Sequence, residues 1–145
     1  MRGRIRKPLQ AFAVACFFSY PGFAASQSVA GIAFVEAPEQ SSGWCTGSNA
    51  GDAIACAREK CVTGGAAAED CKVMQYCYPS LWAADLFQQH KEGLHWHHYL
   101  CGWQSEGDLD FAIETACDGS VADYLAVCEV VAKWSPDGTR IAIAK

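Results

Sequence analysis

All four histidines of the chain fall within nine residues, between His90 and His98. If this segment is a strand, His95 and His97 point to the same face about 7 Å apart, a spacing at which two imidazoles can chelate a transition metal. Imidazole nitrogen suits Zn, Cu and Ni, so one hypothesis is a Zn or Cu site. The alternative is a half-exposed sheet face on which aromatic and imidazole rings stack, and it needs no cofactor. The candidate metal ligands are His90, His95, His97 and His98.

Other side chains with catalytic potential have simpler structural explanations. A nucleophilic cysteine such as Cys101 beside His97 or His98 would need a free thiolate, and an even set of oxidised cysteines leaves none. The acidic residues of Glu106–Asp110 fall in the first turn of an expected helix, where carboxylates stabilise the helix dipole. We therefore predict no catalytic residues and a non-enzymatic protein.

The first 25 residues have the pattern of a signal peptide. Basic residues at positions 2, 4, 6 and 7 precede an apolar run from Leu9 to about Ala25 that ends in small residues, which is typical of a cleaved export signal. The alternative is a lipoprotein signal at Cys16, because Ala13–Cys16 resembles a lipoprotein cleavage site. Cleavage near Ala25 leaves residues 26–145 as a single secreted or periplasmic domain.

The charge of the exported part excludes several classes of partner. Removing residues 1–25 takes away four of the 11 basic residues and none of the 16 acidic ones, so the formal net charge changes from −5 to −9. Such a surface repels nucleic acid and anionic lipid. The apolar run before residue 26 is short and interrupted by Pro21, so we expect no membrane span.

Two similar segments, Gly51–Cys61 and Gly107–Cys117, begin with Gly-Asp, end in Cys and lie 56 residues apart. Each follows an N-cap residue, Asn49 or Ser105, and has small or apolar residues at helical spacing. We therefore expect two helices within an internal repeat. The expected helix ends are Gly64-Gly65 and Asp118-Gly119.

The pattern of the remaining residues predicts mostly strands. Leu81–Phe87 is ambiguous, because Ser80 and Gly93 would also suit the two ends of a helix, but the repeat favours a strand. The prediction is an α+β fold: a mainly antiparallel sheet with two helices on one face, built from two pseudo-symmetric ββαβ units, about 29–78 and 79–145. The expected strands are residues 30–35, 43–46, 71–77, 81–87, 94–103, 128–134 and 141–144.

Eight cysteines follow the signal peptide, an even number that is typical of a disulfide framework in an exported chain. An offset of 56 residues relates Cys45 to Cys101 and Cys61 to Cys117, and Cys71 corresponds to Cys128 with one further residue of displacement. Cys56 and Cys77 have no counterparts. Two cysteines absent together from one unit are most simply bonded to each other in the other unit. The predicted pairs are Cys56–Cys77, Cys61–Cys71, Cys117–Cys128 and Cys45–Cys101.

The same segments resemble a family of small secreted bacterial domains of unknown function. The family unit is a short strand, a Gly-Trp or Gly-Tyr return strand, an alanine-rich helix ending in Cys, and a Cys-x-Val-Val strand. The resemblance implies export and this fold, but it implies no activity. The residues that carry it are Ile32–Phe34, Gly43-Trp44, Ala53–Cys61 and Cys71–Val73, and then Ala112, Cys117 and Cys128–Val131.

Five Trp residues, with Tyr76, Tyr78 and Tyr99, are many for so small a core, and strand alternation would place several of them on the surface. Exposed Trp and Tyr favour contacts with proteins or glycans. The sequence thus predicts an exported, disulfide-stapled domain that binds a protein or envelope component through a sheet face or an aromatic loop. Its oligomeric state is left open.

Overall fold

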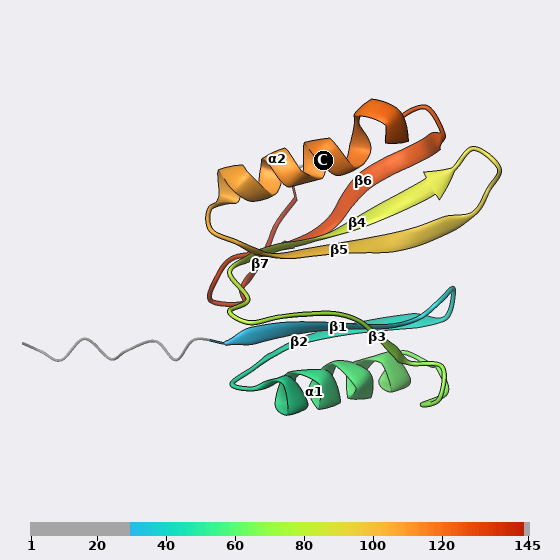
Figure 1. Ribbon diagram of the computed structural model, residues 1–145. Coiled ribbons are helices and arrows are strands. Elements are labelled where there is room, and N and C mark those ends of the chain that lie inside the picture. Colours follow the sequence, from blue (N-terminus) through green and yellow to red (C-terminus); the bar gives the residue numbers. More distant parts are fainter. Residues whose placement is uncertain (1–29, 144–145) are drawn as a thin grey trace, which may run out of the picture.

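The computed structural model describes residues 30–143, which form two antiparallel sheets packed face to face with one helix on each outer side (Figure 1). The first sheet has the strand order β2-β1-β3 and is covered on its outer face by α1, and the second has the order β5-β4-β6-β7 and is covered on its outer face by α2. The elements are β1 (Gly31–Ala37), β2 (Ser41–Gly47), α1 (Ala50–Thr63), β3 (Lys72–Cys77), β4 (Trp82–His90), β5 (His95–Trp103), α2 (Glu106–Cys117), the 3-10 turn η1 (Gly119–Val121), β6 (Leu125–Trp134) and β7 (Arg140–Ile141).

The α+β class and the antiparallel pairing are as predicted, but the layering is different. The sequence predicted one sheet with both helices on one face, whereas the structure has two sheets, each covered by its own helix. The reason lies in β1, whose seven residues are all buried. Ala33 and Val35 pack in the cluster under α1, and Ile32 and Phe34 pack against the second sheet. A strand that is apolar on both faces needs a layer on each side.

Both helices begin and end where the sequence predicts. The Asn49 side chain accepts a hydrogen bond from the Asp52 amide at 3.0 Å, and Ser105 accepts one from the Asp108 amide at 3.1 Å. These caps satisfy amides that have no partner within the helix. The helices end at Gly64 and Asp118.

Helix α1 lies very close to β2 because small residues face each other. Ala53, Ala57 and Cys61 form its buried stripe, and Ile54 is partly buried beside them. A β-carbon on Gly43 would lie 2.1 Å from the Ala57 carbonyl oxygen. Only glycine leaves room for this approach.

The space between the sheets is filled by aromatic rings. Phe34 of β1 stacks on Tyr99 of β5 at 4.7 Å between centroids and meets the Trp134 ring edge-on at 5.3 Å. Trp44 of β2 contacts Trp134 at 4.9 Å. Offset and edge-on pairs at such distances stabilise a core beyond the area they bury.

Four disulfides join the eight cysteines of the described residues, and two of the predicted pairs are confirmed. Cys61–Cys71 and Cys117–Cys128 each connect a helix to the following strand region. The predictions Cys56–Cys77 and Cys45–Cys101 were wrong. The observed pairs are Cys45–Cys56 and Cys77–Cys101.

The correction follows from the two faces of the first sheet. Cys45 lies opposite Ala33, on the face covered by α1, and so reaches Cys56 on that helix. Cys77 lies opposite Ile32, on the face toward the second sheet, where it meets Cys101. Each wrong pair would have had to pass through the first sheet.

An irregularity in β5 explains why the repeat gave the wrong partners. Trp82 pairs with Trp103 and Ala84 with Leu100, so two residues of β5, Cys101 and Gly102, lie opposite the one between. Gly102 has φ of 86°, and β2 pairs with β1 without such a shift. One extra residue turns a strand over, so Cys45 and Cys101 face different layers.

The remaining elements follow the prediction with small changes. The ambiguous segment 81–87 lies in β4, a strand, and the final strand is shorter than expected, at Arg140–Ile141. Each half has the order strand, strand, helix, strand, and β7 follows the second half. No helix in residues 30–143 is long and apolar enough to cross a membrane. The predicted signal peptide and the Cys16 alternative lie outside the described residues.

Candidate binding face

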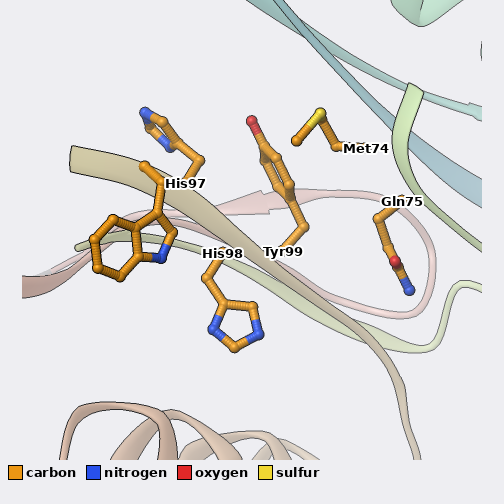
Figure 2. A pocket seen from close by; sticks show the side chains of 6 residues that line it. Met74, Gln75, His97, His98 and Tyr99 are labelled. Atoms are coloured by element: carbon orange, nitrogen blue, oxygen red, sulfur yellow. The ribbon is translucent and has the colours of Figure 1, made fainter. Parts of the chain in front are cut away.

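The edges of the two sheets lie together on the side where β3 and β5 run, and Cys77–Cys101 joins the strands there. A shallow groove of about 530 Å³ opens between them (Figure 2). We call its surroundings the edge face. The edge face consists of Met74 and Gln75 from β3 and Trp96, His97, His98 and Tyr99 from β5.

Side chains of β5 alternate between two environments. His97 and Tyr99 point toward the first sheet, on the side of the strand where Met74 lies, and His98 points the other way, toward α2 (Figure 2). The rings of His95 and His97 both contact Phe87, at 5.6 and 5.8 Å. They therefore share one face, as the strand prediction required.

A small polar cluster lies between the sheets behind the edge face. His97 Nδ1 and Asp85 Oδ1 are 2.7 Å apart, and the Tyr99 hydroxyl donates to Glu36 Oε2 at 3.0 Å. Glu36 is 8% exposed although it is acidic. Because buried carboxylates need hydrogen-bond donors, these contacts fix the polar atoms at this end of the interlayer space.

The cluster raises the pKa of two of its members, His97 and Tyr99. The hydrogen bond to Asp85 raises the pKa of His97, and the charges of Asp85 and Glu36 act in the same direction against the opposing effect of burial. Burial raises the pKa of Tyr99, and the charges of both carboxylates raise it further, so Tyr99 is a neutral hydrogen-bond donor.

A histidine held by a carboxylate is the arrangement of a general base, which would act on a hydroxyl or thiol nearby. Within residues 30–143, the hydrogen bonds of His97 include none to such a group, and every cysteine there is in a disulfide. The arrangement positions an imidazole at the rim of the groove. Absence of enzyme activity stays a prediction.

The four histidines do not converge on one point. His90 accepts a hydrogen bond from the Glu92 amide and stacks on Tyr124, and His95 lies 3.8 Å from Glu39. No group of three or more His, Cys, Asp or Glu side chains in the described part of the chain is placed to hold a metal ion. Zn or Cu binding by these histidines stays a prediction.

Sequence reasoning missed Glu36, Asp85 and Tyr99 as members of the cluster. The available signal was a single acid inside an apolar strand: Asp85 within Leu81–Phe87, and Glu36 at the end of the run that begins at Ala30. An acid in that position must find a partner or change its protonation. The partner's identity could not be read, because it lies on another strand.

Apolar side chains are exposed along and beside the edge face. Four of them are Val73 at 40%, Met74 at 46%, Tyr78 at 58% and Trp96 at 37% exposed. Grouped apolar side chains on a protein surface are typical of contact sites. Trp96 is also oriented, because its Nε1 donates to Gln88 Oε1 at 2.7 Å.

Comparison with known proteins gives no relative for this arrangement: no family model, curated protein or solved structure matches the chain. The resemblance to secreted domains of unknown function therefore rests on the motifs alone. What the protein does has to be inferred from its own geometry.

Proposed function

We propose that this chain is an exported, disulfide-stapled, non-enzymatic protein that binds another protein of the cell envelope or its surroundings through the edge face. The observation that carries the proposal is the groove between β3 and β5, beside which Met74 and Trp96 are exposed.

The disulfides support export. Eight cysteines in pairs are typical of an oxidising compartment and are rare in the cytosol of most organisms. The bonds also keep the edge face rigid, because Cys77–Cys101 lies next to the groove and fixes β3 against β5. A preformed surface loses little entropy on binding.

The composition of the edge face supports a protein partner. It combines aromatic, imidazole and thioether side chains and has no Asp, Glu, Lys or Arg among those that line the groove. Aromatic and Met side chains are enriched at protein interfaces, and charged side chains are depleted at their centres. The acidic remainder of the surface would keep the protein soluble and disfavour anionic partners.

We further propose that the two halves are repeats of one ββαβ unit. Their elements follow the same order, and β2-β1-β3 corresponds to β5-β4-β6. On this view the first unit is the more covalently constrained copy, and the second carries most of the edge face. This is also the division expected from the resemblance to single-unit secreted domains.

Site-directed photo-crosslinking in the native compartment tests the proposed function. A photoreactive amino acid replaces Met74 in one variant and Val62, which is 39% exposed on α1, in the matched control. We expect a crosslinked product from position 74 only, and we expect Trp96→Asp to abolish it. Equal crosslinking from both positions, or none from position 74, would contradict the proposal.

A further inference from the structure

We infer that a second copy of this chain pairs antiparallel with β5, so that the second sheet continues across a twofold axis. This inference goes beyond the proposed function, because it concerns the β5 edge of the edge face and names a second copy of the chain as its occupant. It comes from the backbone groups that β5 leaves open, from the protection of the other sheet edges, and from the charge of the strand.

The direction of each backbone group in β5 follows from the β4–β5 hairpin. The His90 amide donates to the Leu94 carbonyl at 2.7 Å, so Leu94 faces β4. In an antiparallel ladder, residues alternate between facing the partner strand and facing away from it. His95, His97 and Tyr99 therefore direct their N–H and C=O groups away from β4, toward the open edge.

No side chain in residues 30–143 covers these groups with a hydrogen bond. Within the irregularity of the strand, the Gly102 amide does have a partner, because it donates to the Ser80 carbonyl at 2.9 Å. The stretch from His95 to Tyr99 is thus a row of unpaired donors and acceptors. Such a row is a template for another strand.

The other three sheet edges are protected. Lys60 donates to the Trp44 carbonyl of β2, and the turn at Gly138 lies against Thr46 of the same strand. β7 has only two residues, and Arg140 donates from there to the Val131 carbonyl. Short length, a covering segment and a nearby cation each oppose unwanted strand pairing.

β3 is protected in a different way. It begins with Lys72 and pairs with β1 through a register shift at Phe34/Val35, so its edge is irregular. β5 has none of these devices between its first residue and Leu100: it is nine residues long, with no Lys, Arg or Pro. Because the other sheet edges are protected, we take the unprotected edge of β5 to be an edge that pairs with another strand.

Charge favours a second copy as the occupant. β5 contains no Asp or Glu, whereas residues 30–143 hold all 16 acidic residues of the chain. Two acidic molecules repel each other over most of their surfaces, and a strand without carboxylates is where they can approach. The nearest carboxylates, Glu39 and Asp85, already lie beside His95 and His97.

The register follows from the twofold symmetry. With His97 on the axis, His97 faces its own copy and His95 faces the second copy's Tyr99, so that every outward N–H and C=O of the three residues finds a partner. Trp96 then lies opposite His98 of the second copy, twice, on the α2 side. Cross-strand aromatic pairs add to the stability of such a ladder.

The test is the molar mass of the oxidised, untagged protein, measured by sedimentation from low to high micromolar concentration. We expect a monomer–dimer equilibrium. His95→Pro removes one outward N–H from each copy at a position where β4 needs no donor, and it should weaken the dimer about 10-fold or more. The matched control is Ala68→Pro, at the second position of the exposed turn that the Asp70 amide closes onto the Ala67 carbonyl, where proline is favoured.

Hydrogen exchange identifies the interface. The amides of His95, His97 and Tyr99 should be protected at high protein concentration and should exchange rapidly on dilution, with the Trp96 and His98 amides protected in both. A chain that stays monomeric at high micromolar concentration overturns the inference, and so does a dimer whose outward β5 amides remain unprotected.

The two proposals fail differently. If the protein is a monomer and the probe at position 74 still crosslinks to another protein, pairing with a second copy is ruled out and the proposed function stands. If the protein is a dimer and the probe at position 74 crosslinks only to a second copy of the chain, the β5 pairing is supported and binding of another protein is contradicted.

Discussion

β2 and β5 are both edge strands, each paired with the strand before it in the chain, but only β2 is covered. Lys60 donates to the Trp44 carbonyl at 3.0 Å and lies 4.7 Å above the Trp44 ring, so α1 covers β2 with a cation. β5 has no such cover and lines a groove instead. The same strand order therefore leaves β2 covered and β5 open at the edge of its sheet.

The halves also differ in how their helices are attached. In the first, disulfides Cys45–Cys56 and Cys61–Cys71 both anchor α1. In the second, Cys117–Cys128 is joined by Lys133 of β6, which contacts Glu106 and Asp110 of α2 at 2.8 and 2.7 Å. Burial lowers the pKa of Lys133, but the hydrogen bonds to Asp110 and Glu106 outweigh it and raise the pKa overall.

Removal of the disulfide between the layers should have the largest effect. Cys77–Cys101 spans 24 residues of sequence and Cys45–Cys56 spans 11. Because a longer loop restricts the unfolded chain more, we expect Cys77→Ala/Cys101→Ala to lower the free energy of unfolding by about 3–4 kcal/mol, and Cys45→Ala/Cys56→Ala by about 3 kcal/mol. Denaturant unfolding in oxidising buffer measures both, and a larger loss for the second pair would contradict the ranking.

The pairing itself is checked by tryptic digestion without reduction. The peptide 26–58 contains both Cys45 and Cys56, so it should appear without a crosslinked partner. Peptide 73–91, which contains Cys77, should be attached to peptide 92–133, which contains Cys101. Attachment of peptide 26–58 to either of these would show a different pairing.

An added methyl group at Gly43 should have an intermediate effect, because it would force α1 away from β2. The new β-carbon would lie 2.1 Å from the Ala57 carbonyl oxygen, whereas at Gly107 in α2 the nearest atom is 3.9 Å away. We expect Gly43→Ala to lower the free energy of unfolding by about 1–3 kcal/mol. Gly107→Ala is the control and should leave it unchanged or slightly higher. Equal effects would mean that α1 is no closer to its sheet than α2.

The smallest effect concerns the open side, where Asp85 holds His97. The raised pKa of His97 means that the folded state binds the proton more tightly than the unfolded state. This stabilisation is fully present below the ordinary value of 6.5 and is lost as pH rises through the raised pKa. The advantage of the wild type over His97→Gln should therefore shrink with rising pH, by less than about 1 kcal/mol.

Unfolding measured at several pH values checks this expectation. In the Asp85→Asn background, replacing His97 should give a difference that varies much less with pH. An advantage of the wild type that instead grows as pH rises would show that Asp85 does not hold the protonated imidazole.

The sequence by itself determined the local elements of this protein. Caps such as Asn49 and Ser105 act on amides three residues away, and period-two or helical spacing is contained in a short segment. The disulfides Cys61–Cys71 and Cys117–Cys128 were readable for the same reason, since each joins neighbouring elements. Interactions confined to a short stretch of chain leave their pattern in that stretch.

Only the tertiary structure decided which faces meet. The irregularity at Gly102 reverses the direction of Cys101, and the second layer over β1 brings Glu36 to Tyr99 across 63 residues of sequence. The same layering places β3 beside β5 and so forms the groove. A strand's alternation says that its two faces differ, but which neighbour covers each face depends on the packing of distant segments.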